Sequence, residues 1–241
     1  MEADVFQGLK QDMKKELTIF VIIPLLINGL FLGLYFSGVG GLQQVVAPTI
    51  NWLPQNSWRE FGLLEQLQNL LLLAVLTILV LGAFRKTGVL DKGIMVAGSI
   101  VFLFLFLEEI DYGINFYEYL TGGDSGIRLR NWHNQESDGQ QNISRFKQIM
   151  DGMMFLLFFL LPLVKNKIPI PFVQDIAPSR WFILGFALTI SYARLAHFLD
   201  DQGMATINGV EGNLSSNISE FRELSNYYFF MIYALHLVRR N

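Results

Sequence analysis

The chain has no cysteine and few charged residues. None of its 241 residues is cysteine, and only 16% are Asp, Glu, Lys or Arg. The missing thiols exclude disulfides, cysteine nucleophiles, Cys-ligated zinc and iron–sulfur clusters. A soluble domain normally carries about 25% charged residues, so this composition is atypical of one. A net charge of −3 gives no reason to expect nucleic acid as a partner.

Long apolar segments take the place of the missing charge. Hydrophobic residues make up 52% of the chain, and the mean hydropathy is +0.37. A bilayer core about 30 Å thick needs about 20 apolar residues for each helical crossing. Six segments meet this requirement: residues 17–37, 64–84, 93–113, 146–164, 181–199 and 218–238. They predict an all-α fold, a single integral membrane bundle of about six transmembrane helices within residues 17–241.

Three further features refine this picture. Residues 1–16 place Val5, Phe6 and Leu9 on one helical face, which is typical of an amphipathic segment at the membrane interface. The outer loop over about residues 120–145 is the longest polar stretch, and loops of this length are often functional. Gly29 and Gly33 have the spacing of glycines that let membrane helices pack closely, so we expect close packing of the first span.

The distribution of charge predicts the orientation. Cytoplasmic loops of membrane proteins carry an excess of Lys and Arg. If the N-terminus lies inside, 11 of the 18 basic residues fall on the inner side, and 15 of the 21 acidic residues fall on the outer side. We therefore expect both termini inside, with the acidic side of the bundle facing out.

Ionisable residues gather at the outer ends of the predicted spans. A charged side chain at mid-membrane costs about 2.5–3.5 kcal/mol, so each one needs a partner or a function. Helical spacing places them in three stripes: Glu108, Asp111 and Asn115; Ser191, Arg194, His197 and Asp201; and Glu220, Glu223 and Tyr227. If the stripes converge, they form an outward-open polar cavity inside the bundle.

Several of these residues are candidates for chemistry. The candidate catalytic residues are Glu109, Asp111, Glu223 and Arg194, and the candidate ligands of a divalent metal are Glu65, Glu109, His133 and Glu223. No other cofactor is indicated. Arg194 is also expected to pair with a carboxylate such as Glu108, because an unpaired buried charge is costly. The sequence has no HExxH or GxSxG motif, which weighs against a hydrolase.

Four short motifs carry a family resemblance. Residues 108–113 (EEIDYG) and residues 60–65 (EFGLLE) are followed by residues 131–134 (NWHN) and by the acidic pair Glu220 and Glu223. In this order they resemble motifs of a family of uncharacterised bacterial multi-pass membrane proteins with a Glu-Glu-Ile-Ser-Trp-Gly-Gln signature. Asp111, Tyr112 and Ile114 depart from that signature. The resemblance implies a bacterial inner membrane and an outer-side site, but no activity.

Three functions fit the sequence. The first is a non-catalytic accessory or scaffold subunit of a larger membrane complex, energy-transducing or photosynthetic, in contact with lipid and with other integral membrane subunits. The second is a membrane-embedded metal-dependent hydrolase or transferase, and the third is an ion or proton transporter. A compact bundle without a catalytic motif favours the first. The spans show no charge in their inner halves, which weighs against the third.

Overall fold

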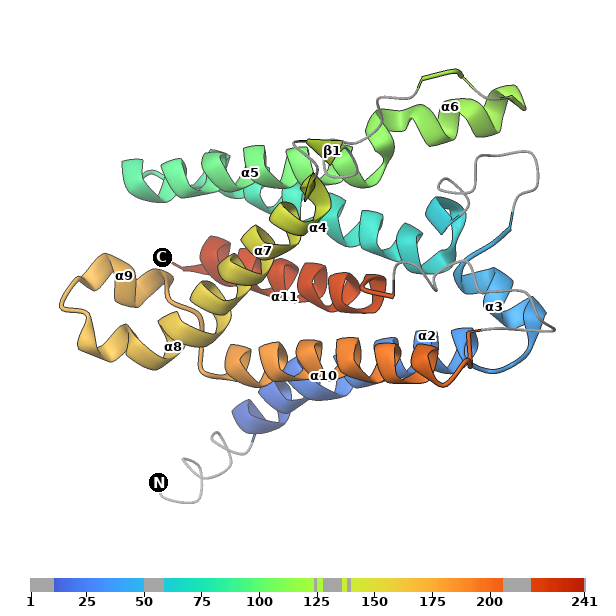
Figure 1. Cartoon of the computed structure of the whole chain (residues 1–241). Helices are drawn as coiled ribbons and strands as arrows, with labels where there is room; N and C mark the ends of the chain where they lie inside the picture. Colours follow the sequence, from blue (N-terminus) through green and yellow to red (C-terminus); the bar gives the residue numbers. More distant parts are fainter. Residues whose placement is uncertain are drawn as a thin grey trace.

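The chain is helical almost throughout in the computed structural model (Figure 1), which describes residues 11–49, 59–123, 125–127, 136–137, 140–205 and 218–240, with the backbone alone at 59, 136, 137 and 140–147. The helices in chain order are η1 (Thr18–Ile22), α2 (Ile23–Tyr35), α3 (Gly40–Val46), η3 (Arg59–Phe61), α4 (Leu63–Arg85), α5 (Val89–Glu109), η4 (Asp111–Gly113), α6 (Ile114–Thr121), α7 (Asn142–Met154), η6 (Phe155–Leu160), α8 (Leu161–Val164), η7 (Lys165–Lys167), α9 (Pro171–Ile176), α10 (Trp181–Asp201) and α11 (Glu220–Arg239). Among these residues the exception is a two-residue antiparallel pair, β1 (Glu136–Ser137) with β2 (Gln140–Gln141). The predicted all-α class is confirmed.

Five helical segments are long and apolar enough to cross a membrane. They are Gln11–Tyr35, Leu63–Arg85, Val89–Glu109, Gln148–Lys167 and Trp181–Asp201. They correspond to the first five predicted segments, so the chain is an integral membrane protein. Within the described residues the first of these helices includes residues 11–16, so this part of the predicted interfacial segment continues directly into the span. Residues 1–10 of the predicted interfacial segment lie outside the described residues.

The sixth long helix, α11, is less apolar than the other five and lies between them in Figure 1. Eleven of its 20 residues are buried, and they include Glu220, Ser225 and Asn226. A helix enclosed by protein can carry polar side chains that lipid would reject, because neighbouring helices supply their partners. Its low hydropathy therefore reflects its central position.

Aromatic rings from distant parts of the chain form the core around α11. The ring of Phe182 on α10 lies 4.7 Å from Phe20 of η1 and 4.8 Å from Phe158 of η6. Phe158 in turn lies 5.1 Å from Phe230 of α11. Centroid separations of about 4.5–7 Å are the favoured range for such pairs, so these contacts hold four segments together.

Close helix approach occurs at Gly82 and Gly185. A Cβ atom on Gly185 would lie 2.6 Å from the ring of Phe229, and one on Gly82 would lie 2.6 Å from the Val238 side chain. Both glycines therefore let a neighbouring helix pack directly on α11. The predicted close packing at residues 29 and 33 is wrong, because among the described residues nothing lies within 4 Å of a Cβ atom added at either position.

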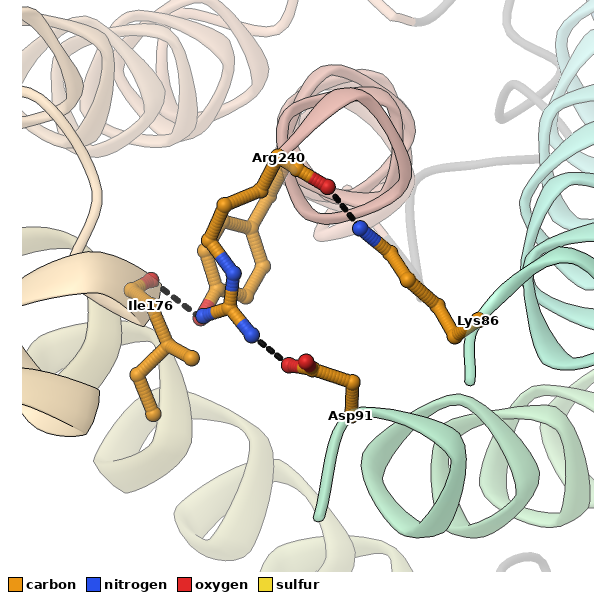
Figure 2. Close-up of polar contacts among 5 residues, drawn as sticks. Lys86, Asp91, Ile176 and Arg240 are labelled. Carbon is orange, nitrogen blue, oxygen red and sulfur yellow. Dashed lines mark hydrogen bonds and ion pairs between the residues drawn. The ribbon is translucent and has the colours of Figure 1, made fainter. Parts of the chain in front are cut away.

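Polar contacts fix α11 at the end of the bundle where α4 ends and α5 begins, which we call the basic end. Figure 2 shows the Arg240 guanidinium paired with the Asp91 carboxylate, while the Lys86 ammonium donates to the Arg240 carbonyl. The Tyr233 hydroxyl donates to the Ile176 carbonyl at 3.0 Å. These contacts join the C-terminal part of α11 and the adjoining Arg240 to α4, α5 and α9.

Candidate functional site

The candidate site begins with an unusual turn at the end of α5. This helix ends at Glu109, earlier than the predicted end at residue 113. The next residues turn through left-handed conformations, with φ of 48° at Asp111, 53° at Tyr112 and 84° at Gly113. Such a conformation costs roughly 1–2 kcal/mol at each residue other than glycine. Backbone strain of this kind is concentrated at functional sites.

The turn corrects one sequence prediction. Glu108, Asp111 and Asn115 were expected to share a stripe of one continuous helix, but the turn separates α5 from α6, so this is wrong. All three side chains are nevertheless buried, with exposed fractions of 1%, 4% and 0%. The turn redirects the chain so that both helices bury polar side chains at the same end of the bundle.

Carboxylates are concentrated at this end, which we call the acidic end. Glu65 of α4, Glu108 of α5, Glu118 of α6 and Glu220 of α11 are each at most 2% exposed. Every one of them makes at least one further polar or electrostatic interaction beyond the contacts described below. Burial of a charged group is tolerated only with such partners. Four separate helices thus contribute buried acids to one region.

Tyr227 connects the acids of α5 and α11. Its hydroxyl donates a hydrogen bond to Glu109 Oε1, and the side chain is 2% exposed. Tyr227 also lies within electrostatic range of Glu220 and Glu223 on its own helix. The expected convergence of the third and sixth predicted spans is therefore present, and Tyr227 lies at its centre.

Tyr112 and Ser125 donate hydrogen bonds to buried carboxylates of α5 and α6. The Tyr112 hydroxyl donates to Glu108 Oε1, and this hydrogen bond, together with partial burial, raises the pKa of Tyr112 to about 12. The hydroxyl and the backbone N–H of Ser125 donate to Glu118 Oε1 at 2.8 and 3.2 Å. Both carboxylates therefore act as hydrogen-bond acceptors, which favours a structural role for them.

α11 is also tied to its other neighbours by buried amides and hydroxyls. Gln68 Nε2 of α4 donates to the Glu220 carbonyl at 2.9 Å and lies 3.4 Å from Glu220 Oε2. On α2, Asn28 Oδ1 accepts a hydrogen bond of 3.2 Å from the Ser225 hydroxyl. Polar contacts therefore cross from α11 to α2, α4 and α5 at the acidic end.

The structure brings together some of the predicted site residues. Glu65, Glu109, Asp111 and Glu223 all lie at the acidic end, but no three His, Asp or Glu side chains of the described residues are placed to hold a metal ion. His133 lies outside the described residues. The proposed four-ligand metal set thus stays a prediction, since one of its members is not described.

Arg194 does not join the acidic network. Its side chain and that of His197 are exposed, and both line a separate cavity bounded by α7, η6, α10 and α11. Within the part of the chain that the structure describes, Arg194 has no ion pair, so the expected pairing with Glu108 or a neighbouring acid is wrong. Helical spacing correctly placed Arg194 and His197 on one face of α10. It could not predict which neighbouring helix that face contacts.

Sequence reasoning missed the apolar surface of α6. This short helix buries Asn115 and Glu118 on one side. On the other side Tyr117 is 59% exposed and Leu120 is 83% exposed, whereas the Tyr119 ring stacks on Phe61 of η3 with centroids 4.7 Å apart. The signal for this helix was present, because polar residues at 115 and 118 with apolar residues at 116, 117 and 120 follow helical periodicity.

Comparisons with known proteins found no matching family model, no matching curated protein and no matching solved structure. The resemblance to the Glu-Glu-Ile-Ser-Trp-Gly-Gln family therefore stays a prediction.

Proposed function

We propose that this protein is a non-catalytic accessory subunit, a scaffold, of a larger membrane complex. The observation that carries the proposal is the exposed apolar side of α6, a helix whose opposite side buries Asn115 and Glu118. Glu118 accepts two hydrogen bonds from Ser125, which fixes the buried side of this helix. A fixed helix with an exposed Tyr117 beside Leu120 resembles the rigid aromatic anchors of protein interfaces.

The test is the mass of the native assembly. In a mild detergent we expect the chain to migrate in a species larger than its own 27.5 kDa plus bound detergent. A double variant, Tyr117→Ser with Leu120→Ser, should release it from that species. Val89→Ser is the control, because the Val89 side chain at the basic end is 87% exposed and Leu120 is 83% exposed. Recovery of the unmodified chain as a lone monomer would overturn the proposal.

A competing explanation of the α6 surface is contact with lipid, since aromatic residues also gather at membrane interfaces. A photoreactive phenylalanine analogue in place of Tyr117 separates the two. A subunit contact predicts cross-links to a polypeptide of discrete mass. Cross-links to lipid alone would contradict the scaffold proposal.

The topology that we propose has six spans, both termini inside, and the acidic end facing the outside of a bacterial inner membrane. Support comes from the charge distribution and from α11, whose 20 residues extend about 30 Å. The chain has no cysteine, so single introduced thiols report cleanly. A thiol reagent that does not cross membranes should label Gln202→Cys, an exposed position just after α10, in intact cells and Val89→Cys only after permeabilisation. The reverse pattern would refute this orientation.

A metal-dependent enzyme is the second candidate function. It is favoured by Tyr227, which donates to Glu109 of α5 and lies within electrostatic range of Glu220 and Glu223 of α11. This reading predicts a stoichiometric divalent metal in the purified protein and its loss in Glu109→Gln and His133→Ala. Elemental analysis of the three proteins is the measurement, and a metal-free wild type would exclude this candidate.

A further inference from the structure

A cavity of about 500 Å³ lies between α7, η6, α10 and α11, apart from the acidic network. Its polar lining consists of Asp151, Thr189, Arg194, His197, Arg222 and Asn226. Its apolar lining comes chiefly from aromatic and aliphatic residues of η6 and α10, such as Phe155, Phe186 and Ile190. The cavity therefore combines a cationic part with an apolar part.

The charged residues of the lining leave an excess of positive charge. Asp151 is the one carboxylate among them, and its two oxygens lie 3.0 and 3.1 Å from Arg222 Nη1. Arg194 has no ion pair among the described residues and is exposed. A second guanidinium thus lines the cavity without a counter-charge from the described residues. An anionic ligand would provide that charge.

Two polar atoms at the cavity have no partner within the described residues. Asn226 is 3% exposed, and its Oδ1 atom, a hydrogen-bond acceptor, is unsatisfied. The Nε–H of Arg222, a donor, is also buried without an acceptor. Buried polar atoms are nearly always paired with protein or solvent. A ligand that both accepts and donates hydrogen bonds would satisfy the two atoms together.

The position of the cavity fits the polar boundary of a bilayer. Arg194 lies seven residues before the end of α10 at Asp201, which corresponds to about 10 Å along the helix. Long basic side chains at this depth extend toward the headgroups. Such extension alone would account for Arg194, but it does not account for Arg222 and Asn226, which belong to another helix and face the same space.

We propose that this cavity binds the headgroup of an anionic phospholipid. The phosphate lies between the guanidinium groups of Arg194 and Arg222, since Arg forms strong charge-assisted hydrogen bonds with phosphate oxygens. A hydroxyl group of the headgroup donates to Asn226 Oδ1. One acyl chain follows the apolar wall formed by Phe155, Phe186 and Ile190. This lipid site does not depend on the scaffold proposal.

The experiment uses the purified, delipidated full chain in detergent. Its thermal unfolding is followed with added dioleoyl phosphatidylglycerol, dioleoyl phosphatidylcholine or glycerol 3-phosphate. We expect phosphatidylglycerol to raise the unfolding temperature in a saturable way, and the other two compounds to have little effect. The same concentration series yields an apparent affinity for each variant. An equal effect of glycerol 3-phosphate would show a site for free phosphate esters and overturn the lipid assignment.

Two substitutions locate the effect in the cavity. Arg194→Gln should weaken the apparent affinity for phosphatidylglycerol about tenfold, and Asn226→Leu should weaken it as well by removing the headgroup acceptor. Arg180→Gln is the matched control, because Arg180 is an exposed arginine at the opposite end of α10 and is not part of the cavity. Equal affinity in wild type and Arg194→Gln, or an equal loss in Arg180→Gln, would overturn the proposal. Arg194 makes no ion pair in the described protein, so its replacement tests binding without breaking a fold contact.

Discussion

Replacement of Tyr227 by phenylalanine isolates one contact of the acidic end. Tyr227 is 2% exposed, and phenylalanine keeps the shape of its ring, so the change removes only the hydroxyl that donates to Glu109. Hydrogen bonds to charged groups contribute about 1.5–3 kcal/mol to stability. We therefore expect Tyr227→Phe to lower the free energy of unfolding by about 1.5–3 kcal/mol.

The chain offers two matched controls with the same substitution. The hydroxyl of Tyr192 is buried and has no hydrogen-bond partner among the described residues, so Tyr192→Phe should leave stability unchanged or increase it. The Tyr233 hydroxyl donates to a neutral carbonyl at 3.0 Å, so Tyr233→Phe should cost about 0.5–1.5 kcal/mol. The expected order of destabilisation is therefore Tyr227, then Tyr233, then Tyr192.

The assay is equilibrium unfolding of the detergent-solubilised protein by a denaturing detergent, followed by tryptophan fluorescence. A double-mutant cycle with Glu109→Gln isolates the pair, because a direct contact predicts an interaction energy of 0.5 kcal/mol or more, on the order of coupled neighbours. If Tyr227→Phe and Tyr192→Phe have the same effect, the Tyr227 hydroxyl does not stabilise the acidic end. The stabilising role assigned to the hydrogen bond from Tyr227 to Glu109 would then be wrong.

Two further predictions concern packing and the basic end. Gly185→Ala places a methyl group 2.6 Å from the Phe229 ring, and overpacking of this kind costs about 1–3 kcal/mol, whereas Gly29→Ala should stabilise its open helix position by about 0.5–1 kcal/mol. Thermal unfolding should show opposite shifts for the two variants, and a stabilised Gly185→Ala would refute the close approach of α10 and α11. Asp91→Asn removes the ion pair with Arg240, whose side chains are 27% and 15% exposed, so we expect a loss of up to about 1 kcal/mol that shrinks in high salt. No loss at low salt would show that this pair does not stabilise the basic end.

Five spans could be predicted from the sequence because a helix that faces lipid must be apolar along nearly its whole length. Trp181–Asp201 and Leu63–Arg85 are clear examples. The same search found the segment of α11, but it could not foresee that α11 lies inside the bundle. In the sequence, Glu220 and Glu223 marked only the outer end of a span, whereas in the structure eleven residues of α11 are buried, Ser225 and Asn226 among them.

The acidic end could be predicted only in part. Charge at the ends of apolar segments marked Glu108, Glu109 and Glu223, since a membrane makes such positions exceptional. The left-handed turn at Asp111 and Tyr112 was not predictable from residue type, because neither residue adopts positive φ as readily as glycine. The location of Arg194 was missed because it depends on which helices pack side by side, and that information lies in tertiary contacts.

The acidic network and the lipid cavity share one helix, α11, but they use different faces of it. One face of α11 carries Glu220, Glu223 and Tyr227, at spacings of three and four residues. Another face carries Arg222 and Asn226, which are four residues apart. At 3.6 residues per turn these faces point in directions about 110° apart. The first face meets α4 and α5, while the second closes the cavity against α7 and α10. A conservative change on one face therefore leaves the groups of the other in place, so Tyr227→Phe should not alter lipid affinity and Arg194→Gln should not weaken the acidic network.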